Sequence, residues 1–452
     1  TVYNKTALKH FHHARWRKVF WWNSAPQIHI KHHTRYLIAS KAVPNYDQNI
    51  TISTEAIAVI KNKFSGLVTE PMGSGLALPY MPTTGGRWDI GLLPGWATSY
   101  LLSMNADAKI ATLGTADLAG SWSAHYRDKN SNLPVSLTSY PYMTLVGNSN
   151  SINPETKKSE ALPLCAGDCS TPNTVDTAHM PSFSYLPYLV TGDYYYLEEL
   201  HFYASWILLS MAPEYREFGK GILKSGQVRG HAWSIRTFSQ AAYIAPDDDP
   251  LKSQLSAIVS NNLEWYNATY SNNTDANKLG AITHSYAFSY DNSTAIAPWQ
   301  DDFFTSAIGH LVELDFSEAK TLIQWKAKFP IGRMMDPSYC WITAASYTLK
   351  LRDSAAAPIY ASLGQAYKAS NTPEFAALEC GSTAMASELG LKTGEMTGYS
   401  SSNSGYPSNL QPALAYSVDS NAPNSQQAWE KFMKRTIKPD YQNGSQFSII
   451  PR

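Results

Sequence analysis

The sequence predicts a mainly α-helical fold, an (α/α) toroid of five to six helical hairpins with a short β-rich segment at the N-terminus. Two observations support this prediction. From about residue 51, an apolar helix-like run repeatedly ends in a short turn containing Asp, and a second amphipathic run follows at once. The first run of each pair is rich in Ala, Leu, Trp and Tyr on all sides, whereas the second is more polar. Inner and outer helices of a ring are expected to differ in this way.

Residues 1–50 differ from the rest of the chain in charge and in the pattern of their apolar residues. The first 46 residues carry eight Lys or Arg and no Asp or Glu, and residues 27–39 alternate partly with period two, which favours strands. We therefore expect a basic, β-rich segment here. Its charge fits an anionic polymer, an acidic neighbouring chain, self-association within a larger chain, or a flank that only balances the acidic remainder.

The hairpins are expected in the main body, residues 51–390. The Asp and Ser residues in their turns are suited to cap the second helix, because a side-chain oxygen accepts from the unpaired N–H groups of its first turn. A helix near 53–64 is expected to pair with a C-terminal segment or to stand alone. The five pairs are predicted at 90–104 with 106–126, 178–191 with 194–212, 228–244 with 249–268, 300–314 with 316–329, and 339–352 with 357–389.

Three segments lack a helical pattern. Long, turn-rich connections are predicted at 127–175 and 269–298, and loops of that length in a compact domain are usually functional. Residues 391–424 are rich in Ser, Asn, Gly and Pro. We therefore expect residues 391–452 to form an extended wrap and a final segment.

The amino-acid composition narrows the range of possible functions. Charged residues make up 16% of the chain, below the roughly 25% of an average soluble domain, while 12% of residues are aromatic. Zero net charge disfavours nucleic acid as a partner, and the longest apolar run, near Trp206–Met211, is too short to span a bilayer. Phosphate-cradling glycine motifs and a nucleophile elbow are missing. Aromatic-rich chains are suited to stack against sugars, although aromatic residues also fill cores and interfaces.

The cysteines and the first residue favour an extracellular or cell-surface location. An even number of cysteines suggests two disulfides, Cys165–Cys169 and Cys340–Cys380. The cysteine spacing disfavours zinc, and we expect no metal and no cofactor. Because the sequence starts at Thr1 rather than Met, we expect a mature or excised piece of a secreted protein.

Four groups of polar and aromatic residues occur at the same phase of the repeat, just before or within the opening turns of successive first helices. If those helices run parallel, the groups meet at one end of the ring and supply the carboxylates, cations and indoles that suit a sugar site. Each residue also has a structural alternative as an N-cap, an ion-pair partner or a packing residue. The groups are Arg87, Trp88 and Asp89; Asp176 and His179; Arg229, His231 and Trp233; and Trp299, Asp301 and Asp302.

A further group closes the second predicted helix. Trp122, His125 and Tyr126 end it, and the long loop after it adds Tyr140 and Tyr142. If this loop folds over the same end of the ring, these side chains add sugar contacts or a Tyr/His acid–base pair.

Three segments resemble the six-hairpin glycosidase superfamily, and most nearly its unsaturated uronyl hydrolases. Residues 175–181 (VDTAHMP) followed by a Thr-Gly-Asp turn, residues 228–234 (VRGHAWS) and residues 88–96 (WDIGLLPGW) are similar to segments that line the pocket in that family. The resemblance implies Asp176 as general acid/base, Asp89 as a second carboxylate, and Arg229, His231 and Trp233 as substrate contacts. It covers roughly residues 85–270, and residues 1–50 have no counterpart.

Three functions remain open from the sequence. The leading hypothesis is a glycoside hydrolase acting on a polysaccharide that contains uronic acid, with Asp176 as a proton donor of raised pKa and Asp89 or Asp302 activating water. The second is a polysaccharide lyase, in which Tyr126, His125, His179 or His231 removes the C5 proton. The third is a non-enzymatic module for sugar binding or assembly in a larger surface protein, fibre or appendage.

Overall fold

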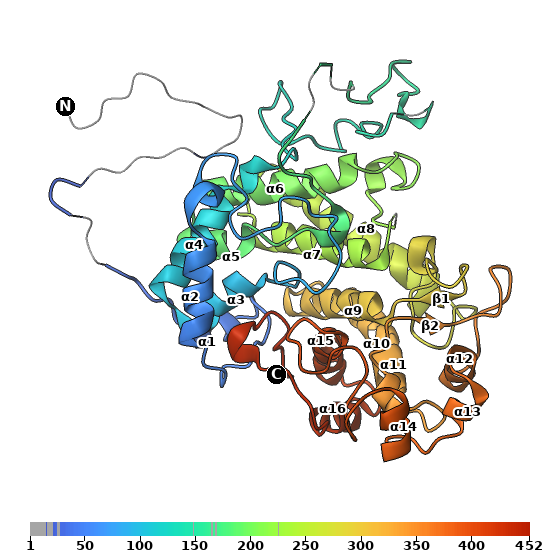
Figure 1. Ribbon diagram of the computed structural model, residues 1–452. Coiled ribbons are helices and arrows are strands. Elements are labelled where there is room, and N and C mark those ends of the chain that lie inside the picture. The colour runs from blue at the N-terminus through green and yellow to red at the C-terminus, as the bar shows by residue number, and fades with distance from the viewer. Residues whose placement is uncertain are drawn as a thin grey trace.

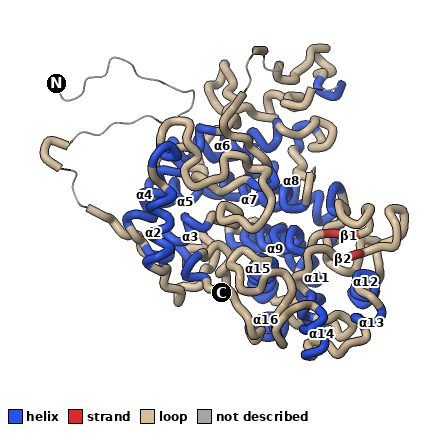
Figure 2. Tube along the Cα trace, in the orientation of Figure 1, coloured by secondary structure: helices blue, strands red, loops and turns tan. Residues whose placement is uncertain are grey.

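The computed structural model describes residues 15, 21–24, 28–147, 149–163, 166–167, 170–224 and 226–452. The chain is mainly helical, with a single two-stranded sheet in the described part, as Figures 1 and 2 show. The prediction of a mainly α-helical fold is therefore confirmed.

The N-terminal region was predicted to be β-rich, and for its described residues this is wrong. Helix α1 (Thr34–Ala39) begins after His33, whose Nδ1 accepts from the backbone N–H of Tyr36, and it buries Ile38. The alternating residues Ile28 and Ile30 are 78% and 66% exposed, and within residues 28–50 only an isolated bridge at Tyr46 has β-pairing. The alternation has no neighbouring strand to pair with, so it does not become a strand.

Helix α2 (Thr54–Lys63) confirms the helix predicted near 53–64. Ser53 caps it by accepting from the N–H of Ala56, and the same hydroxyl donates to Asn443 near the C-terminus. The helix also packs against α4. It therefore contacts both a C-terminal segment and the first hairpin.

Four of the predicted hairpins are present, and most of their helices are shorter than predicted, although α7 has the predicted bounds and α9 begins two residues earlier. In each, the two helices pack against each other, and the turns carry the expected caps, with Asn105 capping α4 and Asp193 capping α6. The helices are α3 (Gly95–Ser103) with α4 (Ala106–Asp117), α5 (Tyr185–Thr191) with α6 (Tyr194–Leu209), α7 (Val228–Ile244) with α8 (Lys252–Tyr266), and α9 (Pro298–Glu313) with α10 (Ala319–Lys326), which α11 (Lys328–Met335) continues.

The helix predicted at 339–352 is absent from the structure. This segment forms a short 3-10 turn at Trp341–Thr343 and strand β2 (Leu349–Lys350), which pairs antiparallel with β1 (Ala295–Ile296), with Ala295 opposite Lys350 and Ile296 opposite Leu349. Only short helices follow: α12 (Leu363–Ser370), α13 (Pro373–Ala376) and α14 (Thr383–Glu388). Pairing with β1 and a covalent tie fix this region more strongly than local helix propensity does.

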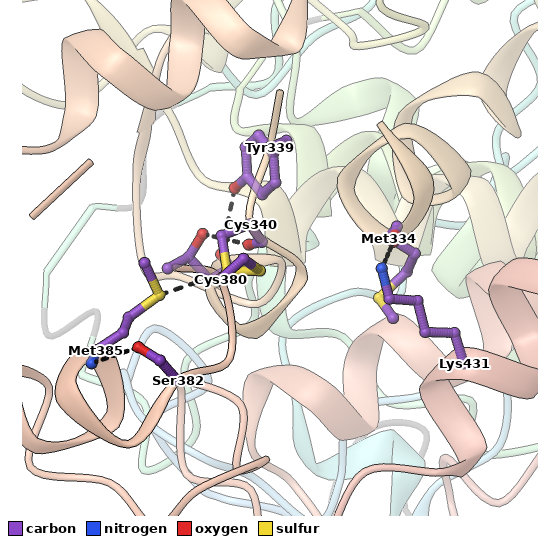
Figure 3. Close-up of a disulfide and its surroundings, with 8 residues drawn as sticks. Met334, Tyr339, Cys340, Cys380, Ser382, Met385 and Lys431 are labelled. Atoms are coloured by element: carbon purple, nitrogen blue, oxygen red, sulfur yellow. Dashed lines mark hydrogen bonds between the residues drawn. A yellow bond between two sulfur atoms is a disulfide. The ribbon is translucent and has the colours of Figure 1, made fainter. Parts of the chain in front are cut away.

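That tie is the predicted disulfide between Cys340 and Cys380, which the structure confirms (Figure 3). It joins the start of the 3-10 turn to the segment before α14, and the Sγ of Cys340 lies 3.5 Å from the Sδ of Met385. The predicted pair Cys165–Cys169 lies outside the described residues.

The fifth hairpin forms where an extended wrap was predicted. Helices α15 (Tyr406–Asp419) and α16 (Ser425–Met433) pack against each other, and α15 also packs against α9. Pro407 sits in the first turn of α15, where its missing N–H costs nothing, and Pro412 lies within the helix. Burial of α15 from Pro407 to Ser417 outweighs the low helix propensity of its sequence.

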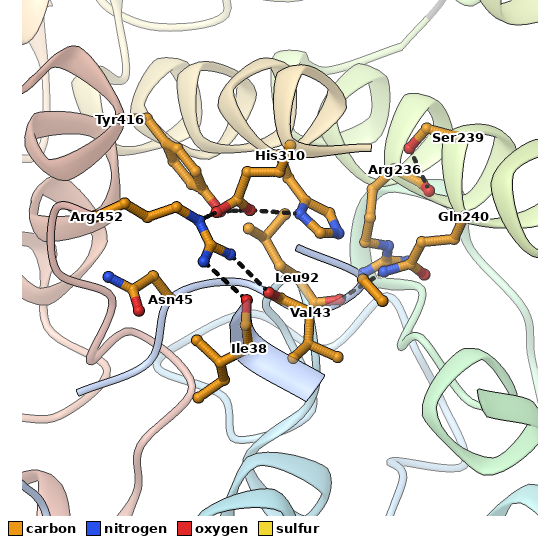
Figure 4. A network of polar contacts seen from close by, with 12 residues as sticks. Ile38, Val43, Asn45, Leu92, Arg236, Ser239, Gln240, His310, Tyr416 and Arg452 are labelled. Carbon is orange, nitrogen blue, oxygen red and sulfur yellow. Dashed lines mark hydrogen bonds and ion pairs between the residues drawn. The ribbon is translucent and has the colours of Figure 1, made fainter. Parts of the chain in front are cut away.

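The C-terminal residues connect distant helices. Ser445 donates to Thr98 in α3, and the ring of Phe447 lies 5.8 Å from that of Phe303 in α9. Arg452 pairs with Glu313 and donates to the carbonyls of Ile38 and Val43, as Figure 4 shows. Residues near both ends of the chain therefore belong to one packed core.

Candidate active site

A cavity of about 610 Å³ opens where the N-terminal ends of three neighbouring helices meet. Helix α9 packs between α7 and α15 (Figure 1). The first residues of each of these helices line the cavity together with the loop at 84–90. This convergence is the arrangement expected from the shared phase of the sequence groups. Of the predicted site residues, Arg87, Arg229 and Trp299 line the cavity.

One wall of the cavity is aromatic. The indole of Trp299 lies 5.7 Å from the ring of Tyr406 and 6.3 Å from the ring of Tyr347, with 21° between the ring planes in each pair. Tyr290 packs edge-on against Tyr347, and Tyr399 packs against Tyr406. Tyr347 and Tyr399 remain 52% and 75% exposed. Exposed rings beside a cavity provide flat faces for stacking.

Arg229 places a guanidinium group against this wall. Its Cζ lies 5.4 Å from the Trp299 ring centre, and its Nε donates to Gln227 at 2.7 Å. Burial lowers the pKa of Arg229, but a guanidinium remains protonated in proteins. The cavity therefore holds a fixed cation next to stacked rings.

Arg87 also lines the cavity, but its charge is balanced locally. The side chain forms a two-point ion pair with Asp89 and donates to the carbonyls of Met81 and Thr83. Both members of the pair are buried. Asp89, expected as a second carboxylate for catalysis, therefore holds the loop and Arg87 in place.

Asp176 and His179 form a second polar pair, across the 3-10 turn Thr177–His179 that packs on α7. The Nδ1 of His179 lies 2.5 Å from Oδ2 of Asp176, and the Asp176 side chain is 26% exposed. Among the described residues, Nε2 of His179 has no hydrogen-bond partner.

The electrostatics of this pair differ from the expected ones. Burial acts to raise the pKa of Asp176, but the bond and charge of His179, the N–H of Ala178 and the charge of Arg229 outweigh it. The pKa of Asp176 is therefore lowered, and the expectation of a raised value was wrong. Burial lowers the pKa of His179 against the effect of Asp176, with Arg229 and Arg87 adding to the lowering.

Asp301 and Asp302 lie inside the protein rather than at the cavity. Asp301 pairs with Lys326 and accepts from the N–H of Ile282, while Asp302 pairs with Arg333. All four side chains are buried. Burial raises the pKa of Asp302 to about 6, against the opposing charge of Arg333. These carboxylates tie α9 to α10 and α11.

Three of the other predicted contact residues pack in the core. His231 stacks on His284 with 5.1 Å between ring centres and 9° between ring planes. Trp233 packs against Phe303 at 4.8 Å, and Trp122 packs against Phe183 at 5.0 Å. All three are about 1% exposed, so none is open to a ligand in this conformation.

The group after the second helix lies away from the cavity. His125 is buried and hydrogen-bonds to Glu199 at 2.7 Å, and burial raises the pKa of the half-buried Tyr126. The loop that follows, with Tyr140 and Tyr142, is held near the C-terminal end of α6, where the hydroxyl of Thr144 donates to the carbonyl of Met211 at 2.9 Å. The loop contributes no lining residue to the cavity.

Trp88 lines a smaller cavity of about 390 Å³ beside the first one. Its ring packs edge-on against Trp96, with 5.9 Å between centres. A Cβ atom at Gly95 would fall 1.6 Å from the Trp88 ring, so only glycine fits at the start of α3 with this ring in place.

Two polar atoms at the main cavity are left without partners in the described part of the chain. These are Nε1 of Trp299, a donor, and Oδ1 of Asn409, an acceptor, and both belong to lining residues. Buried polar atoms are normally satisfied, so an unpaired donor and acceptor beside a cavity suit the hydroxyl groups of a ligand. Sequence patterns did not identify Asn409 or the four wall tyrosines. Tyr406 and Asn409 lie in the first turn of α15, a helix that was not predicted, and the other three tyrosines lie in connections between helices.

Another cavity, of about 600 Å³, lies at the opposite ends of α9 and α15. Its lining includes a single aromatic residue, Tyr416, whose hydroxyl donates to Glu313 at 2.7 Å, and Glu313 also pairs with His310 and Arg452, although Oδ2 of Asp419 has no partner in the described residues. This cavity is therefore a weaker candidate for ligand recognition.

The described residues form neither a metal-binding cluster nor a membrane-spanning helix. They contain no cluster of three or more His, Cys, Asp or Glu arranged to hold a metal ion. None of the helices formed by these residues has the length and apolar character needed to span a membrane. Comparison with protein-family models, with characterised proteins and with solved structures finds no match to this chain.

Proposed function

We propose that the helical hairpins form an (α/α) toroid related to the six-hairpin glycosidases, with α3, α5, α7, α9 and α15 as its inner helices. The contacts of α9 with both α7 and α15 support this arrangement, as does the greater burial of these first helices. Residues 445–447 would close the ring between α3 and α9. An experimental structure in which α3 and α15 lie on opposite sides of the molecule would contradict the proposal.

We propose further that this protein is a secreted carbohydrate-active enzyme that binds an acidic polysaccharide at the N-terminal ends of the inner helices. The observation that carries the proposal is the Arg229 guanidinium beside the stacked rings of Trp299, Tyr347 and Tyr406. Sugar rings stack on such faces, and a fixed guanidinium pairs with a uronate or sulfate group. The unpaired atoms of Trp299 and Asn409 are suited to sugar hydroxyls.

Glycosidic bond cleavage by hydrolysis is the first candidate reaction. With its lowered pKa, Asp176 is ionised at neutral pH and would activate the attacking water, rather than donate the proton. The hydroxyl of one of the tyrosines that line the main cavity would protonate the oxygen of the leaving sugar. Burial raises the pKa of Tyr290 to about 12, so this hydroxyl carries a proton to give.

Elimination is the second candidate, and the state of His179 favours it. An imidazole whose pKa is lowered is neutral at pH 7, and its Nε2 has no partner in the described residues, so it is suited to accept a proton. His179 is 3% exposed and, like Asp176, does not line the main cavity, so this route requires a shift of the turn at residues 177–179 that exposes Nε2. His179 then takes the C5 proton of a uronate that Arg229 neutralises. The C4–O bond then breaks, and the leaving oxygen takes a proton from a wall tyrosine.

One assay separates these reactions. Purified protein is incubated with acidic and neutral polysaccharides while near-ultraviolet absorbance and new reducing ends are recorded together. Reducing ends alone indicate hydrolysis, and both signals together indicate a lyase, because elimination leaves a 4,5-unsaturated uronate. Binding of a polysaccharide without either signal would indicate a sugar-binding module rather than an enzyme.

Asp176→Asn tests the catalytic assignment. We expect the product signal to fall at least about a hundredfold, as for loss of a positioned acid–base group, with the melting temperature within a few degrees of the wild type. Asp247→Asn is the matched control, since Asp247 is a fully exposed carboxylate paired with Lys252. Equal activity of Asp176→Asn and Asp247→Asn would remove Asp176 from the mechanism.

A further inference from the structure

The main cavity has a neighbour that shares part of its wall. The cavity at Trp88 is lined by Gly86 and Ser404, and both residues also line the cavity at Arg229. We call these the Arg229 cavity and the Trp88 cavity. Two cavities of about 610 and 390 Å³ therefore share a glycine and a serine in their walls.

The Trp88 cavity repeats the chemistry of its neighbour. Trp88 supplies an indole, and the Nζ of Lys63 lies 5.0 Å from the centre of its ring. Lys63 ends helix α2 and is exposed. Glu55, from the first turn of the same helix, lines the cavity as well and provides an acceptor. An aromatic ring beside a cation thus occurs in both cavities, on different helices.

A buried amide completes the Trp88 cavity. Gln446 is 1% exposed, and its Nε2 donates to the carbonyl of Arg87 at 3.4 Å. This bond fixes the amide, and the other atom, Oε1, has no partner in the described part of the chain. A buried acceptor at a cavity wall that lacks a partner is suited to a ligand hydroxyl.

Gly86 lies in the part of the wall that the two cavities share. Gly85 and Gly86 are exposed and carry no side chain, and a Cβ atom at Gly86 would lie 2.8 Å from Oγ of Ser404. Any larger residue at Gly86 would have to displace Ser404 or rise above the shared wall. A chain of sugar units lying across Gly86 therefore meets no side chain from residue 86 itself and passes beside the hydroxyl of Ser404.

We propose that the Trp88 cavity is a second subsite, so that one acidic oligosaccharide lies across Gly86 with different sugar units in the two cavities. This inference rests on the proposed function and narrows its substrate class to an extended chain with acidic groups on more than one unit. One acidic group pairs with Arg229 and another with Lys63. Trp88 supports the second sugar, and Gln446 accepts from one of its hydroxyls.

The test is the dependence of affinity on ligand length. Calorimetric titration of the full chain uses disaccharides and hexasaccharides prepared from pectate, alginate and hyaluronan. We expect a hexasaccharide to bind the wild type at least about tenfold more tightly than its disaccharide, since filling a second subsite adds contacts. Trp88→Ala and Lys63→Gln should each remove most of that gain.

Lys61→Gln is the matched control for Lys63→Gln. Lys61 lies on the same helix and pairs with Asp107, outside both cavities, so its loss should leave the length gain intact. Lys63 is exposed, so its variant is expected to fold even if Trp88→Ala does not.

Three results would overturn the inference, and they can be told apart. Equal affinity for both lengths, with binding still lost in Arg229→Gln, would refute the second subsite and leave the proposed function standing. The second subsite would also be refuted if Lys63→Gln and a correctly folded Trp88→Ala both still bind the hexasaccharide more tightly than the disaccharide, as the wild type does. No binding of any oligosaccharide by the wild type would refute the proposed function and this inference together.

Discussion

Arg229 differs from the other buried arginines of the described residues in what its guanidinium faces. Arg216 donates to carbonyls of five other residues and Arg236 to those of Gly91 and Met180, while Arg333 pairs with Asp302 and donates to Ala344. These arginines hold backbone segments together. Arg236 and Arg333 also lie over aromatic rings, but the ring beneath Arg229 belongs to a cavity wall, where the charge of Arg229 is available to a ligand. Burial alone therefore does not identify a binding arginine.

His284 makes the protein sensitive to acid. Burial, together with the nearby His231 and Lys224, lowers the pKa of His284 to about 2, and its Nδ1 contacts the hydroxyl of Tyr270. The unfolded chain binds a proton there at its ordinary pKa of about 6.5. Because the folded pKa is lowered, the stabilisation is fully present above about pH 6.5 and is lost as pH falls towards 2.

The corresponding prediction concerns the slope of stability against pH. His284 should cost about 1.4 kcal/mol of unfolding free energy for each pH unit below about 6.5. His284→Gln retains an acceptor for Tyr270 without this titration, so its stability should fall less steeply between pH 7 and pH 5. Denaturant melts of both proteins across this range measure the two slopes. Parallel slopes would show that His284 is not the responsible group.

At the scale of elements, two buried ion pairs fasten α9 to the helices after it. Asp302 pairs with Arg333 of α11, and Asp301 pairs with Lys326 of α10. These carboxylates were expected to act on a substrate, but their partners lie 31 and 25 residues away in sequence. A local sequence pattern cannot show that such residues meet, so a buried ion pair and a catalytic acid look the same from sequence.

Removing one partner should destabilise the fold strongly. Arg333→Met leaves Asp302 buried without its cation, and we expect a loss of about 3–5 kcal/mol of unfolding free energy. The double variant Asp302→Asn, Arg333→Met removes both charges and should recover part of that loss. Denaturant unfolding of the single and double variants measures the coupling. Additive losses would contradict a direct interaction between the two side chains.

The hairpins that the sequence predicted share a clear physical signal. Asn105 and Asp193 stand in turns between an apolar helix and an amphipathic one, and both cap the second helix as expected. The two failures have tertiary causes. The apolar run 339–352 is held by a disulfide and by strand pairing, and α15 is made helical by burial despite Pro412. Neither cause is visible within a local window of sequence.

The candidate site was predictable in part. Arg87, Arg229 and Trp299 occur at equivalent positions of successive predicted hairpins, and the structure places all three at one cavity because the N-terminal ends of those hairpins lie close together. The wall residues Tyr290, Tyr347 and Tyr399 come from connections between helices, whose paths depend on the folded molecule. With so many tyrosines in the chain, no pattern separates these from the ones in the core.

At the scale of the whole molecule, the residues after position 33 belong to the same core as the helices. Ile38, Val43 and Tyr46 are buried, and the carbonyl of Ala42 accepts from the hydroxyl of Tyr185 in α5. Arg452 donates to carbonyls in this same stretch (Figure 4). Removal of residues 34–46 should therefore destabilise the fold.

Two truncations test this dependence. A chain that starts at residue 34 keeps the buried stretch and is expected to melt within a few degrees of the full protein. A chain that starts at residue 47 loses Ile38, Val43 and Tyr46, and each buried apolar side chain of this size contributes about 1.5–3 kcal/mol. We therefore expect it to melt much lower or to be insoluble. Similar melting of the two chains would show that residues 34–46 contribute little to stability.

The most direct test of the central claim is titration of the full chain with acidic hexasaccharides. We predict that the wild type binds at least one of them and that Arg229→Gln weakens this binding at least about tenfold, since a charge-assisted bond is lost. Arg352→Gln is the control, because Arg352 lies over the ring of Phe288 outside the Arg229 cavity. Equal affinity of the wild type and both variants, or no binding by the wild type, would contradict the account.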